Sequence, residues 1–169
     1  MIAHALLALA TLAAADTPSP APTAATFAFD ARTADGRRVV YPGDARGKPL
    51  VLVVGLDQNA AKPSAVWAAA LQRRVGARAT VVGVAVLDRV PRFVRGFVES
   101  EIDRRIGPPR AGEAGFVTTF SGADLRARAP AGDDGTPVIY IFNASGAVAA
   151  IQRRAFSEGD ANAVERDVP

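Results

Sequence analysis

The sequence has 169 residues, of which 49% are hydrophobic and 22% charged, and a formal net charge of +3. This composition indicates one globular domain with a sizeable core and excludes a disordered chain. The chain has no cysteine, which excludes thiol–disulfide exchange, thiol peroxidase chemistry and cysteine zinc sites. Its arginine doublets lie beside acidic residues or at helix ends instead of gathering with aromatics, so we expect no nucleic-acid partner.

The N-terminal residues 2–15 form an uncharged apolar run that is too short to span a bilayer. The three alanines at 13–15 fit the small-residue rule for cleavage, so the sequence predicts a signal peptide over residues 1–15 and a periplasmic or secreted protein. An uncleaved anchor is the alternative. Residues 16–25, rich in proline, alanine and threonine, predict a flexible linker. The only histidine, His4, lies before this linker, so a cleaved chain would have no Cys–His or Ser–His dyad.

The first part of the following segment predicts a hairpin, a buried strand and a helix. Residues 26–41 hold two short alternating runs around an Asp-Gly pair at 35–36, a strong hairpin signal. Pro49–Leu56 is a continuous apolar run, which indicates a strand covered on both faces. A polar elbow follows at Asp57–Lys62, and Pro63 then lies in the first turn of a predicted helix.

In the rest of the chain, residue patterns typical of strands alternate with patterns typical of helices. The predicted helix after Pro63 places Trp67 and Leu71 on its buried face, and a second helix from about Pro91 places Phe97 and Ile102 inward. Strands are predicted over residues 79–87, 116–120, 137–142 and 147–152, a helical turn over 123–127 and a closing helix over 158–167. This order predicts an α/β three-layer sandwich with a mixed central sheet and helices on both faces.

Four short motifs in this order resemble the thioredoxin-like superfamily, in its TlpA/ResA-like or AhpC/TSA-like envelope branch. They are the Phe29-Asp30 and Asp35-Gly36-Arg37 hairpin, the Arg46-Gly47-Lys48-Pro49 lead-in, Gly135-Thr136-Pro137 before an apolar strand, and the Asn143–Gly146 turn. The resemblance implies a thioredoxin-like domain over residues 26–169 and a cis peptide bond before Pro137. A plain strand start at Pro137, which needs only a trans bond, is the alternative.

The redox site of that family is missing. The resemblance places its two cysteines at Gln58 and Ala61, with the basic residue Lys62 just after them. Neither glutamine nor alanine can act as a thiolate nucleophile. The sequence therefore indicates an exported, cysteine-free thioredoxin-fold protein without thiol redox activity. We interpret it as a binding or assembly module for a partner protein, a peptide or a small anion in the cell envelope.

The candidate binding residues lie at the elbow and at the segment that the resemblance places opposite it. They are Asp57, Gln58, Asn59, Lys62, Thr136 and Pro137. Backbone N–H groups at a helix start and the Lys62 ammonium would favour an anion. The 136–137 segment would lend backbone groups to an extended peptide, as the resemblance implies. The alternative for the elbow is plain helix capping by Asp57 or Asn59.

Other functions remain as alternatives. A non-thiol enzyme would need Asp57 or another carboxylate as base, or metal assistance, and no paired spacing indicates either. A purely structural, degenerate domain would need no site at all. Residues 43–49 differ from a P-loop in spacing and precede a strand, so we reject that motif. Asp133-Asp134-Gly135 predicts a turn and not a calcium site. We predict no cofactor and no metal site, and we place Trp67 and the eight phenylalanines in the core.

Overall fold

The computed structural model describes residues 27–106, 109–133 and 135–169. The predicted signal peptide over 1–15 and linker over 16–25 lie outside the described residues. Within the described ranges, no helix is both long enough and apolar enough to cross a membrane.

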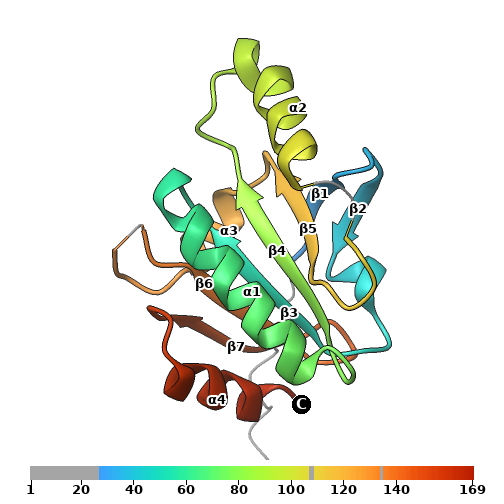
Figure 1. Ribbon diagram of the computed structural model, residues 1–169, viewed down its shortest axis with the longest axis vertical. Coiled ribbons are helices and arrows are strands. Elements are labelled where there is room, and N and C mark those ends of the chain that lie inside the picture. The colour runs from blue at the N-terminus through green and yellow to red at the C-terminus, as the bar shows by residue number, and fades with distance from the viewer. Residues whose placement is uncertain (1–26, 107–108, 134) are drawn as a thin grey trace, which may run out of the picture.

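Seven strands form one mixed sheet in the order β2-β1-β5-β4-β3-β6-β7 (Figure 1). Strands β3, β4 and β5 are parallel, whereas β6 runs antiparallel to both β3 and β7, and β1 runs antiparallel to both β2 and β5. The mixed sheet of the prediction is thus confirmed. The strands are β1 Phe29–Thr33, β2 Arg38–Tyr41, β3 Leu50–Gly55, β4 Thr80–Val86, β5 Gly115–Thr119, β6 Val138–Phe142 and β7 Val148–Arg153.

Helices cover both faces of this sheet, which confirms the three-layer α/β architecture. Helices α1 and α4 share one apolar cluster with one face, and Leu125 of α3 belongs to the cluster on the other (Figure 1). The helices are α1 Ala61–Val75, α2 Arg95–Ile106, α3 Ala123–Arg128 and α4 Glu158–Asp167, with short 3-10 turns η1 Gly43–Ala45, η2 Gln58–Ala60 and η3 Arg92–Val94.

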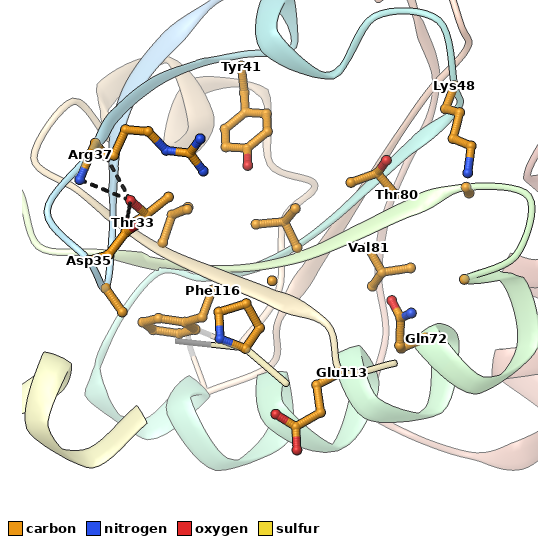
Figure 2. A pocket seen from close by; sticks show the side chains of 17 residues that line it. Thr33, Asp35, Arg37, Tyr41, Lys48, Gln72, Thr80, Val81, Glu113 and Phe116 are labelled. Carbon is orange, nitrogen blue, oxygen red and sulfur yellow. Dashed lines mark hydrogen bonds between the residues drawn. The ribbon is translucent and has the colours of Figure 1, made fainter. Parts of the chain in front are cut away.

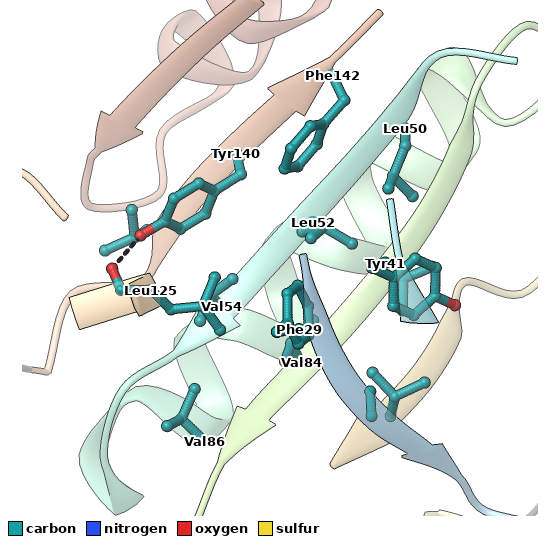
Figure 3. Close-up of a cluster of buried hydrophobic side chains, with 14 of the residues drawn as sticks. Phe29, Tyr41, Leu50, Leu52, Val54, Val84, Val86, Leu125, Tyr140 and Phe142 are labelled. Atoms are coloured by element: carbon teal, nitrogen blue, oxygen red, sulfur yellow. Dashed lines mark hydrogen bonds between the residues drawn. The ribbon is translucent and has the colours of Figure 1, made fainter. Parts of the chain in front are cut away.

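The central strand β3 is buried along its whole length, as its continuous apolar run predicts. Because successive side chains of a strand point to opposite faces, Leu52 and Val54 join one cluster, and Val51 and Val53 join the other. Figure 3 shows the first cluster, in which β3 lies beside the rings of β6 and β1. The apolar clusters on the two faces of the sheet therefore both include side chains of β3.

Helix α2 departs from the prediction that Phe97 faces inward. The side chain of Phe97 is 75% exposed, and Phe93 in η3 is 90% exposed. Six of the twelve residues of α2 are charged, so little apolar surface is available to hold it on the sheet. Figure 1 shows α2 projecting past the end of β4. The assignment of all eight phenylalanines to the core is wrong for these two, and Phe116 and Phe120 are only partly buried and belong to neither apolar cluster.

Turn chemistry accounts for the remaining polar motifs. Asn143 Oδ1 accepts hydrogen bonds from the N–H groups of Ser145 and Ala147, each at 3.0 Å, and so organises the β6–β7 turn. Asp133 Oδ1 accepts from Gly135 N–H at 3.1 Å. The P-loop-like segment forms η1 and an extended lead-in to β3. Each of these motifs has the local role that the sequence predicts.

We expect Tyr140→Phe to lower the free energy of unfolding by about 1 kcal/mol at neutral pH, because the buried Tyr140 hydroxyl donates to the carbonyl oxygen of Leu125. Burial raises the pKa of Tyr140 to about 12, against about 10 in an unfolded chain. The wild type therefore loses stability as the pH rises from about 10 towards 12, and the variant lacks this contribution. Urea unfolding at pH 7 and at pH 11 measures both effects. A variant equal to wild type at pH 7 would contradict the hydrogen bond.

Candidate functional site at the strand-to-helix elbow

The elbow, residues 57–62, carries the chain from the end of β3 into α1. Asp57 is the N-cap of η2, and its Oδ1 accepts hydrogen bonds from the N–H groups of Asn59 at 2.7 Å and Ala60 at 3.0 Å. These bonds satisfy donors that a helix start leaves unpaired. The capping role that the sequence offers as an alternative is confirmed for Asp57.

Arg126 of α3 holds the start of the elbow from the opposite layer of the fold. Its Nη2 donates to the carbonyl oxygen of Leu56, and it also binds Asp88 through Nε at 3.0 Å and Nη2 at 2.9 Å. The hydrogen bond and charge of Arg126 hold the pKa of Asp88 below its usual range. This bidentate pair ties the segments after β3 and β4 to α3.

The other polar elbow residues are open to solvent. Gln58, Asn59 and Lys62 are all exposed. Their side chains make no hydrogen bond or ion pair with another residue of the described ranges. They are therefore available to a ligand without breaking an internal contact.

The structure brings one end of the elbow against the segment before β6. A concavity of about 290 Å³, which we call the elbow hollow, lies between them. A Cβ on Gly135 would lie 3.6 Å from Asn59 Cβ, so the two segments approach closely. The hollow is lined by Lys62, Pro63, Val66, Gly135, Thr136, Pro137, Ala155 and Phe156.

The far wall of the elbow hollow is fixed to α1 by Trp67. The indole Nε1 of Trp67 donates to the carbonyl oxygen of Arg154 at 3.1 Å. The ring of Phe156 packs edge-on against Trp67, with 5.2 Å between centroids and 85° between planes. The wall formed by Ala155 and Phe156 is thereby held in place by a fully buried side chain.

The peptide bond before Pro137 differs from the expectation. Within the described ranges, the cis peptide bond is the one between Tyr41 and Pro42, so the expected cis bond before Pro137 is wrong. Thr136 N–H donates to the carbonyl oxygen of Asp133 at 3.0 Å, which closes a turn just before β6 begins at Val138. Pro137 then leads into the strand without removing a ladder donor.

The six predicted site residues do not form one cluster. Lys62, Thr136 and Pro137 line the elbow hollow, and Asn59 lies beside Gly135 at its edge. Asp57 lines a different cavity on the other side of α1, and Gln58 lines neither.

Sequence reasoning missed Val66, Ala155 and Phe156 in the elbow hollow. Val66 had a usable signal, since it lies one helical turn after Lys62. The other two reach the site only through tertiary packing.

A second concavity, of about 380 Å³, lies at the opposite ends of β3 and β4 (Figure 2). Its rim carries charged side chains from separate elements, including Arg37, Lys48 and Glu113. A hydrogen bond from Thr33 lowers the pKa of Asp35 in the adjoining turn. These charges have mixed signs. Within the ranges that the structure covers, no group of three or more histidine, aspartate or glutamate residues could hold a metal ion.

Comparison with known proteins identifies the fold. No family model matches the sequence, and no curated protein matches it. A putative thiol:disulfide interchange protein DsbE from Chlorobium tepidum aligns over 85% of this chain and 91% of its own, with 18% identity and a TM-score of 0.57.

The pneumococcal exposed lipoprotein thioredoxin Etrx1 from Streptococcus pneumoniae aligns over 84% of this chain and 100% of its own, with 14% identity and a TM-score of 0.56. BsSco, a member of the Sco family of cytochrome c oxidase assembly proteins, aligns over 84% and 90%, with 12% identity and a TM-score of 0.55. The chain has an α/β thioredoxin-like fold, and it lacks the cysteines of the redox site that this fold usually carries.

We expect Asp88→Asn to lower the free energy of unfolding by about 2 kcal/mol at pH 7, because it removes the charged partner of Arg126. The lowered pKa of Asp88 means that its stabilisation is present above about pH 4 and is lost as the pH falls through the folded-state pKa. The gap between wild type and variant should therefore narrow towards pH 3. Urea unfolding at pH 7, 5 and 3 measures it, and a gap that stays constant would contradict this assignment.

Proposed function

We propose that this chain is an exported thioredoxin-fold binding module that carries out no thiol redox chemistry. The observation that carries the proposal is the elbow hollow, which is formed jointly by the elbow and the 135–137 segment. The resemblance places a redox site and its bound peptide at this position. Thiol exchange needs a thiolate, and the chain has no cysteine.

The lining of the elbow hollow favours an extended protein segment as ligand. Pro63, Val66 and Phe156 give it an apolar surface, and Val66 is 42% exposed. Lys62 is the cation among the lining residues. An apolar side chain beside an acidic residue matches this surface, since the first buries apolar area and the second meets the ammonium. The N–H of Thr136 already donates to Asp133, so it is not available to a bound segment.

Export is part of the same proposal. It rests on the predicted signal peptide over 1–15 and linker over 16–25, which would leave residues 26–169 as the mature thioredoxin-like domain. The description of one structural neighbour as an exposed lipoprotein agrees with it. The description of BsSco as a member of an assembly-protein family agrees with an assembly role for the module. We place the partner in the cell envelope.

The binding proposal predicts a local response to peptides at Val66. The cysteine-free chain allows a single environment-sensitive fluorophore to be attached to Val66→Cys. We expect saturable binding of an extended peptide with a leucine next to an aspartate. The same peptide with lysine for aspartate should bind roughly fivefold more weakly, as loss of about 1 kcal/mol implies. Lys62→Glu should reverse this preference.

The matched control carries the same fluorophore at Ala144→Cys. Ala144 is exposed in the β6–β7 turn, at the opposite end of β6 from the elbow hollow. It should give no response. Equal responses at the two positions, or none at Val66→Cys with either peptide, would sink the binding proposal.

The redox part of the proposal predicts that wild type gives no insulin reduction above buffer. Ala61 N–H donates to the carbonyl oxygen of Gln58, so these positions end one hydrogen-bonded turn. Such a separation lies within the reach of a disulfide. We therefore expect Gln58→Cys/Ala61→Cys to form an intramolecular disulfide and to reduce insulin with dithiothreitol. The two single variants are the controls. Turnover by wild type would refute the redox-inactive assignment.

A further inference from the structure

The two most exposed large apolar side chains of the described chain lie together, where the chain leaves β4. Phe93 in η3 is 90% exposed and Phe97 in α2 is 75% exposed, against 42% for Val66 and 37% for Val40. Helix α2 follows η3 directly, and the two phenylalanines are four residues apart, so they are neighbours on one helical face. Neighbouring exposed apolar side chains mark an interaction site more often than single ones do.

Arg95 holds this segment so that the two rings face outward. Its Nε donates to the carbonyl oxygen of Val90 at 3.0 Å, and its guanidinium lies 4.4 Å from the centre of the Phe120 ring. Arg95 lies two residues from each of Phe93 and Phe97, which places it on the opposite side of the helix. The exposure of the rings therefore follows from a specific contact. We call the exposed side of this segment the projecting face; it comprises Arg89, Arg92, Phe93, Gly96, Phe97 and Ser100.

The charge on the projecting face is positive. Arg89 and Arg92 are exposed, and the side chain of Arg92 forms no hydrogen bond or ion pair with another described residue. The acidic side chains described between residues 88 and 104 are only 19% to 25% exposed, and each pairs with an arginine: Asp88 with Arg126, Glu99 with Arg32 and Glu101 with Arg104. Among the side chains that the structure describes, the projecting face thus combines aromatic rings with arginines and carries no carboxylate.

The shape of the projecting face favours a lipid surface over a protein partner. Figure 1 shows α2 extending beyond the end of β4. Neither Phe93 nor Phe97 lines any of the concavities of 290 to 600 Å³ found on the described chain. A protein partner would have to match this protrusion closely, because protein interfaces pack as densely as protein interiors. A fluid bilayer adapts to it, and phenylalanine beside arginine is typical of helices that lie in the headgroup region.

We propose that the projecting face docks on the surface of an anionic phospholipid membrane. Phe93 and Phe97 enter the boundary between headgroups and acyl chains, at a depth of about 5–10 Å. Arg89 and Arg92 contact the lipid phosphates. Because β3 and β4 are parallel, the elbow and α2 follow the same end of the sheet, and docking turns that end towards the membrane. This proposal goes beyond the peptide-binding function and does not depend on the elbow hollow.

A local fluorescent label on the full chain tests the proposal. We attach an environment-sensitive fluorophore to Ser100→Cys in the otherwise cysteine-free chain and add vesicles of phosphatidylglycerol and phosphatidylcholine in equal parts. We expect a saturable blue shift, and at least tenfold weaker binding to phosphatidylcholine alone. Binding should weaken with added salt, because the screening length falls from about 10 Å at 0.1 M to about 3 Å at 1 M.

The same fluorophore at Ala144→Cys is the positional control. Ala144 is exposed in the β6–β7 turn, at the opposite end of the sheet from α2, and its label should not respond. A label of this kind also separates the projecting face from the apolar run at residues 2–15. Full chain that sediments with the vesicles while the Ser100→Cys label stays unchanged would overturn the proposal.

Removal of the rings should weaken docking. We expect Phe93→Ser/Phe97→Ser to reduce the affinity for the mixed vesicles at least tenfold, because both side chains that enter the bilayer are lost. The substitutions lie at exposed positions, and far-ultraviolet circular dichroism checks that the fold is kept. Val40→Ser removes an exposed apolar side chain from β2 and should bind as wild type. Equal losses in the two variants would contradict the assignment of the rings.

Reversal of the arginines should remove the preference for anionic lipid. We expect Arg89→Glu/Arg92→Glu to bind the mixed vesicles at least tenfold more weakly than wild type, since each arginine near the surface contributes about fivefold. The matched control is Arg46→Glu/Lys48→Glu, which makes the same change in net charge at exposed positions just before β3, at the opposite end of the sheet. Equal effects of the two charge reversals would overturn the proposal.

Other occupants of the projecting face would give different results. A Ser100→Cys label that responds to an acidic amphipathic peptide but not to vesicles would assign the face to an acidic protein. Self-association of wild type without lipid, lost in Phe93→Ser/Phe97→Ser and accompanied by no vesicle response, would assign it to a second copy of this chain. Either result would overturn the membrane proposal.

Discussion

The burial of β3 on both faces is the constraint on which the rest of this fold depends. The chain has no disulfide, because it has no cysteine, so non-covalent contacts must hold the layers together. Alternate side chains of β3 enter two separate apolar clusters, one shared with α1 and α4 and the other with α3. Because the elbow follows β3 directly, the end of this strand determines where the elbow lies. Arg126 reinforces that position from the α3 layer, since it binds the carbonyl oxygen of Leu56 just beyond the strand.

Local signals in the sequence were sufficient to predict most strands and helices, because burial of one face of an element imposes a regular spacing on its apolar residues. The continuous run at Pro49–Leu56 predicts β3, and the helical repeat that includes Trp67 predicts the buried face of α1. Helix α2 shows the limit of this reasoning. Its apolar positions define a face, but periodicity does not state what covers that face. With half its residues charged, α2 leaves Phe97 largely exposed.

The candidate site was predictable only where it is local in sequence. Capping by Asp57 follows from residue type and position, and Lys62 follows from the elbow itself. The approach of the 135–137 segment came from the resemblance and not from any pattern in the residues. The wall formed by Ala155 and Phe156 could not be foreseen, because it depends on the hydrogen bond of Trp67 to Arg154 across the α1–α4 layer.

The elbow hollow keeps its form without a cysteine pair because none of its supports is a cysteine. Asp57 caps the turn, Trp67 anchors the far wall, and Asp133 closes the turn before Pro137. Each of these contacts contributes to the stability of the domain whether or not a thiol is present. Selection for folding alone would therefore preserve the supports. It does not require Val66 to be exposed beside the hollow, since covering this side chain would stabilise the fold.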